Sequence, residues 1–114
     1  MPQALYREIS DDDQTSARRR EHDVLDRAVA MLEAARESGS ADPVREEALD
    51  CVDAIWGAFM TDLSDDANAL DAALRAQLIS IGLWNFRKTT ELRLGAGDLA
   101  PLIEVNAIVR DGLR

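Results

Sequence analysis

The side chains that most often carry catalysis or bind metal ions are scarce in this sequence. His22 is the only histidine and Cys51 the only cysteine. A zinc site needs several such ligands, and a reactive thiol needs a base beside it, so neither is predicted. A single cysteine also excludes an internal disulfide. We expect Cys51 to pack as a small hydrophobe and His22 to be a solvated residue at the edge of a helix face.

Two acidic stretches and one glycine pair are the remaining candidates for chemistry. Neither Asp11-Asp12-Asp13 nor the stretch from Asp62 to Asp71 has the spacing and the glycine of an EF-hand loop. Gly95-Ala96-Gly97 follows no predicted strand and precedes no Gly-Lys-Ser/Thr, so it is not a phosphate loop. The sequence therefore predicts no catalytic residues, no metal ligands and no cofactor, and we do not expect an enzyme.

The charge distribution argues against nucleic acid as a partner. The net charge is −9, with 17 acidic residues against 7 arginines up to Leu70 and a near balance after it. Affinity for phosphate backbones depends on Lys and Arg, which release counterions. The cluster Arg18-Arg19-Arg20 is flanked by acidic residues, which favours a solvated helix start. We predict no direct binding of nucleic acid.

The N-terminus and the apolar runs indicate where the chain resides. The start, MPQALYREISDDD, lacks the charged region and the apolar core of a secretory signal. No apolar run approaches the ~20 residues that are needed to cross a bilayer. We expect a soluble, cytoplasmic chain that does not enter a membrane.

Composition and periodicity predict an all-α fold. Residues that favour helix dominate, whereas aromatic residues make up only 4% of the chain. We predict one domain over residues 1–114, a small four-helix bundle (13–114) preceded by a short N-terminal arm (1–12) whose Leu5, Tyr6 and Ile9 either dock or fray. Short connections indicate antiparallel neighbours, and Gly39, Asp42 and Pro43 are a helix stop, a cap and a first-turn proline. The predicted helices run from near Asp13–Ser16 to Ser38-Gly39, from Pro43 to Leu63, from Ala69 to Leu94, and from a cap at Asp98 to about Gly112.

The third predicted helix is apolar on two sides. One line of apolar residues holds Leu70, Leu74, Leu78, Ile81 and Leu92. A second line, roughly opposite on a helix with 3.6 residues per turn, holds Ile79, Leu83, Phe86 and Leu94. Such a helix is either buried in the middle of a bundle, which is the interpretation we favour, or covered on one side by a partner.

The bulky side chains gather near the ends of the second and third predicted helices. Trp and Met are enriched in partner-binding surfaces, and an apolar groove commonly binds a helix. The alternative is that these residues form the core of the bundle, or that some form the floor of a groove. The predicted partner-binding residues are Trp56, Phe59, Met60, Ile79, Leu83, Trp84 and Phe86.

Several stretches of the chain resemble the FlaF family. The most specific is Ile55-Trp56-Gly57-Ala58-Phe59-Met60-Thr61-Asp62-Leu63, followed by Asn68-Ala69-Leu70 and by Leu74-Arg75-Ala76-Gln77-Leu78-Ile79-Ser80-Ile81-Gly82. The tail from Leu102 to Leu113 and the first predicted helix, with Leu25-Asp26-Arg27-Ala28 and Leu32-Glu33-Ala34-Ala35-Arg36, are also similar. The resemblance covers nearly the whole chain and is weakest at the extreme N-terminus.

The resemblance implies a role in flagellum biogenesis. Members of this family belong to alphaproteobacterial flagellum assembly and regulate flagellin synthesis opposite the repressor FlbT. They are also thought to bind flagellin, whose termini are amphipathic and unstructured before assembly. Because the charge disfavours RNA, we expect a cytoplasmic, chaperone-like regulator that binds flagellin and promotes its synthesis and secretion. The alternative is a regulatory adaptor that binds FlbT or another regulator and affects flagellin translation indirectly.

Overall fold

The computed structural model describes residues 3–38, 43–95 and 97–113, and of residues 3–14 it describes the backbone only. Within that part the chain forms four helices and no strand. The helices are α1 (Gln3–Ser38), α2 (Pro43–Leu63), α3 (Ala72–Arg93) and α4 (Ala100–Asp111). The predicted all-α class and the small four-helix bundle are confirmed. None of the described helices is long and apolar enough to span a membrane.

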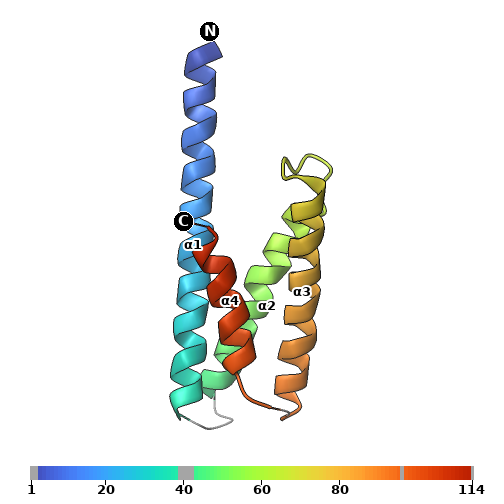
Figure 1. Cartoon of the computed structure of the whole chain (residues 1–114). Coiled ribbons are helices and arrows are strands. Elements are labelled where there is room, and N and C mark those ends of the chain that lie inside the picture. The colour runs from blue at the N-terminus through green and yellow to red at the C-terminus, as the bar shows by residue number, and fades with distance from the viewer. Residues whose placement is uncertain (1–2, 39–42, 96, 114) are drawn as a thin grey trace.

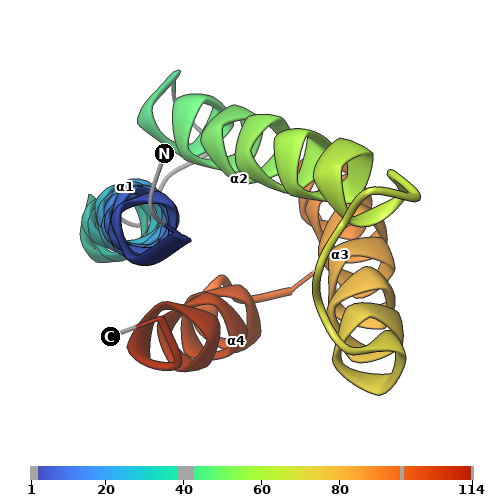
Figure 2. The ribbon, with the colours of Figure 1, turned by 90° about the horizontal axis from the view of Figure 1, so that it is seen from above.

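The helices pack as an incompletely closed bundle, in the order α4, α1, α2, α3. Helix α1 packs along both α2 and α4, and α2 packs along α3, whereas α3 and α4 meet over a short stretch only. Seen from above in Figure 2, α1 and α3 lie on opposite sides of the bundle, with α2 and α4 between them. In Figure 1 the α2–α3 hairpin leans away from α1 and α4 toward its connecting loop, while the first turns of α1 extend past the other helices. The bundle is therefore closed at one end and open at the other.

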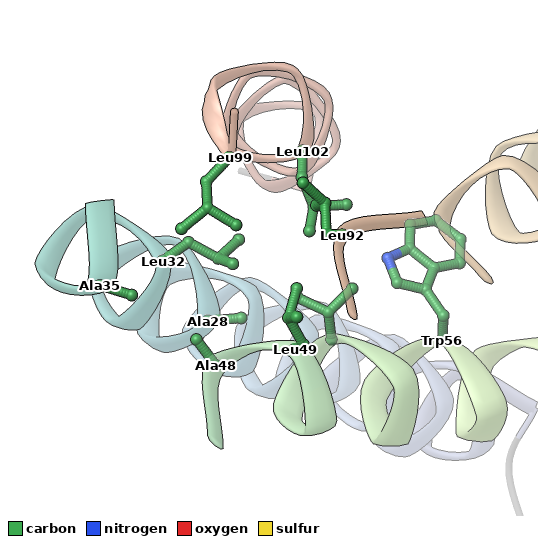
Figure 3. Close-up of a cluster of buried hydrophobic side chains, with 10 residues drawn as sticks. Ala28, Leu32, Ala35, Ala48, Leu49, Trp56, Leu92, Leu99 and Leu102 are labelled. Carbon is green, nitrogen blue, oxygen red and sulfur yellow. The ribbon is translucent and has the colours of Figure 1, made fainter. Parts of the chain in front are cut away.

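The apolar core fills the closed end. Figure 3 shows Leu99 and Leu102 of α4 facing Leu32 of α1, with Leu49 of α2 and Leu92 of α3 beside them. All five side chains are buried. Trp56 lies at the edge of this cluster, toward the open end. Burial of a side chain the size of Val, Leu or Phe stabilises a fold by about 1.5–3 kcal/mol, so this cluster holds all four described helices together.

Local signals explain where three of the helices begin. Pro43 occupies the first position of α2, where its missing N–H is not needed. The carboxylate of Asp71 caps α3 by accepting the N–H of Ala73 at 3.2 Å. At the start of α4, the Asp98 carboxylate accepts the N–H of Ala100 at 3.1 Å. The N-cap residue itself is Leu99, which makes no side-chain capping bond, so the predicted cap at Asp98 is one residue too early. The turn before it needs glycine, because Gly95 and Gly97 have φ of 85° and 94°.

The predicted start of the first helix is wrong. The helix begins at Gln3, about ten residues before the predicted start near Asp13–Ser16, so the backbone of residues 3–12 continues α1 instead of forming a separate arm. Asp and Ser are capping types, but these residues are also tolerated inside a helix, and neither Gly nor Pro interrupts residues 3–38. The side chains of Leu5, Tyr6 and Ile9, and the predicted stop and cap at Gly39 and Asp42, lie outside the described residues.

The favoured interpretation of the third helix, burial in the middle of the bundle, is also wrong. Its buried residues form a strip that faces α2 and α4 and includes two polar side chains; they are Gly82, Asn85, Thr89 and Leu92. Leu92 is the one residue of the first apolar line in this strip, and the rest of the strip lies between the two lines. The other residues of both lines therefore flank the contact and are left partly open. Leu74 and Leu83, one from each line, are 44% and 51% exposed. Helix α3 also starts at Ala72, three residues later than predicted, because Asp71 is its cap.

Gly82 permits the close approach of α3 to α2. A Cβ at this position would lie 2.6 Å from the Met60 sulfur and 3.1 Å from the Trp56 ring. We expect Gly82→Ala to destabilise the fold by about 1 kcal/mol, because overpacking costs about 1–3 kcal/mol and the helix propensity of alanine returns only about 1 kcal/mol. Gly57→Ala is the matched control, since its Cβ would meet nothing within 4 Å. It should stabilise the fold by ~0.5–1 kcal/mol. Urea denaturation measures both; a stabilising Gly82→Ala would contradict the close approach.

Candidate partner-binding site

A chain of buried hydrogen bonds fixes Trp56 at the edge of the core. The indole N–H of Trp56 donates to the Asn106 side-chain oxygen at 2.8 Å. The Asn106 amide in turn donates to Asn85 at 2.8 Å and to the Leu102 carbonyl at 2.9 Å. Asn85 donates to the Ile81 carbonyl at 2.9 Å. Because all three side chains are at most 1% exposed, this network joins α2, α3 and α4 at one depth in the bundle.

A second polar contact holds α3 against α2. Thr89 donates to the Asp53 carboxylate at 2.7 Å. Arg93, one turn further along α3, pairs with Asp53 at 2.7 Å and with Asp50 at 2.8 Å. These bonds fix the orientation of the α2–α3 hairpin, which supplies most of the groove described next.

An apolar groove lies at the open end of the bundle, next to Trp56. It is lined by six apolar residues of α2, α3, α4 and the 64–71 loop and by Leu113, together with two carboxylates. The hollow measures about 70 Å³. The lining residues are Glu21, Trp56, Phe59, Asp62, Leu63, Leu70, Leu78, Val109 and Leu113.

A ring contact and a buried hydrogen bond hold the aromatic floor of the groove in place. The rings of Trp56 and Phe59 lie edge to face, with centroids 5.4 Å apart and planes at 82°. Trp56 is held by its hydrogen bond to Asn106, so the floor of the groove is part of the bundle core. Leu70 and Leu78 form the wall on the α3 side, and Leu70 is 41% exposed. The groove therefore presents a fixed floor and an accessible apolar wall.

Both charged residues that line the groove are acidic. Burial raises the pKa of Glu21, and the nearby carboxylate of Asp62 raises it further, while Arg20 and Arg18 partly oppose both effects. Among the described residues, the Glu21 carboxylate has no hydrogen-bond or ion-pair partner. Asp62 has one long contact, 3.5 Å to the Asn68 amide. The groove thus combines an apolar floor with two acidic side chains at its rim, and the nearby arginines offset the charge of Glu21 only in part.

The raised pKa of Glu21 predicts how one substitution changes stability with pH. A group whose pKa is higher in the folded state favours folding below its unfolded pKa, and that contribution is lost as the pH rises through the folded pKa. At pH 7 the ionised Glu21 therefore opposes folding. We expect Glu21→Gln to raise the melting temperature by about 2 °C at pH 7, an effect kept small by solvent screening.

The same comparison has a built-in control. Below the ordinary glutamate pKa of 4.5 both chains are neutral at this position, so the difference in melting temperature should close. Glu33→Gln, at an exposed position on the same helix, should not show this pattern. A Glu21→Gln chain that is less stable than the parent at pH 7 would contradict the assignment.

The predicted partner-binding residues do not form one surface. Trp56 and Phe59 line the groove, although Trp56 is 1% exposed and is chiefly a core residue. Met60 is half-buried and packs beside Gly82. Trp84 and Phe86 are half-buried against the core cluster. Ile79 is half-buried and Leu83 half-exposed, and neither lines the groove. Partner binding by this set stays a prediction.

Sequence reasoning missed several lining residues. Leu70 and Leu78 belong to the first apolar line of the third predicted helix, whereas the prediction had selected residues of the second line. Val109 of α4 and Leu113 after it lie on the apolar stripe of the fourth predicted helix. That stripe indicates a buried face, but it does not indicate a partner-binding site. Glu21 gave no signal, because a glutamate in a helix is ordinarily solvated.

Other candidates for chemistry lie apart from the groove. Cys51 is half-buried, and burial raises the pKa of its thiol, as suits a packing residue. His22 lies within α1 and is half-buried. Its Nδ1 is 3.2 Å from the Asp23 carboxylate, and its Nε2 is buried without a hydrogen bond among the described residues. The described residues hold no group of three or more His, Cys, Asp or Glu side chains placed to bind a metal. A wider, open hollow between α1 and α4 is lined largely by charged side chains such as Glu33, Arg36 and Glu104.

Comparison with known proteins gives one match. The family model described as flagellar protein FlaF matches residues 2–113, which is nearly the whole chain. No matching relative was found among curated proteins, and no match among solved structures.

Proposed function

Because the chain belongs to the FlaF family of flagellar proteins, we propose that it acts in flagellum biogenesis by binding flagellin in the cytoplasm. In this role it is a chaperone-like regulator that promotes flagellin synthesis and secretion without catalysing a reaction. The observation that carries the proposal is the apolar groove between the α2–α3 hairpin and α4.

The form of the groove suits an amphipathic segment. Apolar grooves on helical domains bind helices through side chains spaced by three or four residues. Trp56 and Phe59 supply a rigid aromatic floor, and aromatic residues contribute strongly to binding energy. Flagellin termini, amphipathic and unstructured before assembly as the family resemblance implies, are segments of this kind. Covering them would also prevent premature polymerisation.

The proposal is tested by calorimetry with purified flagellin. Leu70→Asp places a charge on the accessible wall of the groove, and Leu70 is exposed enough for the fold to tolerate the change. Burial of one leucine is worth about 1.5–3 kcal/mol, so we expect the affinity to fall by at least tenfold. Leu83→Asp is the matched control, since Leu83 is 51% exposed on α3 but lies outside the groove.

Two results would overturn this assignment. A folded chain that does not bind flagellin excludes the chaperone role. Loss of binding in Leu83→Asp but not in Leu70→Asp moves the site to the second apolar line of α3.

A regulatory adaptor is the second candidate function. Leu83 and Leu94 of the second apolar line are 51% and 82% exposed and lie away from the groove, so α3 offers a separate apolar surface. Under this alternative the chain would capture FlbT from a strain that lacks flagellin, and Leu83→Asp would abolish the capture. Failure to capture FlbT in that strain, together with direct flagellin binding, favours the chaperone role.

A further inference from the structure

We propose that the groove selects an amphipathic helix that places a lysine or arginine between the carboxylates of Glu21 and Asp62. This inference rests on the proposed function, because it names the chemistry of the segment that the groove would hold. It goes beyond that function in assigning a charge to the partner and two residues of this chain to its recognition.

The first support is the arrangement of the lining residues. Glu21 comes from α1 and Asp62 from the last turn of α2, so the two carboxylates flank the apolar floor from different helices. The other lining residues are apolar. A ligand that covers the floor must therefore pass close to two acidic groups, and an apolar ligand alone would desolvate them without compensation.

The second support is electrostatic. Burial and the neighbouring Asp62 both disfavour the charged form of Glu21, and the exposed Arg18 and Arg20 only partly offset this. The described contacts give Glu21 no ion pair, whereas Arg36, Arg93 and Arg110 are each paired with a carboxylate. A cation that approached from a ligand would satisfy both groove carboxylates, and charge-assisted hydrogen bonds are about twice as strong as neutral ones.

The third support is size. A hollow of about 70 Å³ has room for several water molecules, given the ~10–15 Å³ that one requires. It is therefore suited to one aliphatic side chain and not to a whole helix. A helix lying across the rim would insert one apolar side chain and carry its basic residue three or four positions away, on the same face. The net charge of −9 would also favour the encounter with a basic segment.

The test uses three 18-residue helical peptides with leucines at i, i+4 and i+7. They differ in one position on the same face, which is Lys, Gln or Glu. Binding of each labelled peptide to the full chain is measured by fluorescence anisotropy at low and at moderate salt. We expect the Lys peptide to bind about tenfold more tightly than the Gln peptide, the value of one charged hydrogen bond, and the Glu peptide to bind most weakly.

Substitutions in the chain separate the charge effect from the apolar contact. In the Glu21→Gln/Asp62→Asn double variant the preference for Lys over Gln should disappear, while the affinity for the Gln peptide is kept. A Glu33→Gln/Glu104→Gln double variant, which changes two acids of the wider hollow between α1 and α4, should retain the preference. Leu70→Ser, which removes apolar surface from the groove wall without adding a charge, should weaken binding of all three peptides.

The outcomes distinguish this inference from the proposed function. Equal binding of the three peptides, or no binding, overturns the inference, and direct flagellin binding can still hold. Selective binding of the Lys peptide without flagellin binding upholds the inference and overturns the proposed function. If sedimentation shows a dimer that Leu70→Asp dissociates, the groove is occupied by a second copy of this chain and the inference is overturned.

Discussion

Asn106→Ala is expected to lower the free energy of unfolding by about 3–5 kcal/mol, because an unpaired buried polar group costs about 1–3 kcal/mol. The truncation leaves two groups without partners, the indole N–H of Trp56 and the side-chain oxygen of Asn85. Asn106 is itself 0% exposed, so water cannot replace the lost bonds without opening the core. Urea denaturation followed by circular dichroism measures the loss.

Asn68→Ala is the matched control for this prediction. The Asn68 side chain also makes hydrogen bonds, to the Asp62 carbonyl at 3.1 Å and from the Leu70 N–H at 3.0 Å. These bonds are exposed to solvent, so their loss should cost only about 1 kcal/mol or less. If Asn106→Ala cost no more than Asn68→Ala, the buried network would not contribute as described.

A double-mutant cycle tests whether the network acts as a unit. Asn85→Ala removes the acceptor that Asn106→Ala would leave unpaired. We therefore expect the double variant to be less destabilised than the sum of the single variants, by about 0.5–3 kcal/mol, the range for residues that share a network. Strict additivity would mean that Asn85 and Asn106 contribute independently.

The sequence was sufficient for the elements whose ends have strong local signals. Helix α2 runs from Pro43 to Leu63, as predicted, because a first-turn proline and a continuous apolar stripe mark it. The start of α1 could not be placed in the same way. Asp and Ser near residue 13 are N-capping types, but they mark the start of a helix only where the backbone before them is not helical. Nothing in residues 3–12 interrupts the helix.

The predictions that failed mainly concern which faces of the helices pack against each other. Asn106 was visible on the apolar stripe of α4, but its partners Trp56 and Asn85 lie 50 and 21 residues away along the chain. A helical wheel shows which residues share a face, and it does not show which face meets which. In α3 the sequence offers two competing apolar lines, whereas the buried strip combines Leu92 of one line with the polar Asn85 and Thr89.

The groove illustrates the same limit. Trp56 and Phe59 were predicted because bulky aromatic residues are enriched at interfaces, and both line it. The walls come from Leu78 of α3 and Val109 of α4, and the rim from Glu21 of α1. Their proximity depends on how the α2–α3 hairpin leans away from α4, which follows from the packing at the closed end.

Leu102→Ala is expected to destabilise the fold by about 3 kcal/mol, within the ~2–5 kcal/mol range for buried Leu→Ala changes. Leu102 is 0% exposed and belongs to the cluster that joins α4 to the other helices. Helix α4 has only 12 residues, which is at the lower end of the ~12–15 residues below which an isolated helix is only marginally stable in water. It therefore depends on this packing to remain in place. Ile108→Ala is the control on the same helix, since Ile108 is 68% exposed; it should change stability by less than ~0.5 kcal/mol.

Because α4 meets α3 over only a short stretch, the loss of Leu102 should loosen α4 before the rest of the bundle unfolds. Hydrogen exchange under native conditions should show faster exchange for α4 amides, including those of Ile103 and Asn106, than for α2 amides. Equal acceleration in both helices would contradict local release.

Since α4 contributes Val109 to the groove, Leu102→Ala should also weaken partner binding although Leu102 does not line the groove. Ile108→Ala should leave binding unchanged. The buried leucine would then act on binding only by holding α4 against α1.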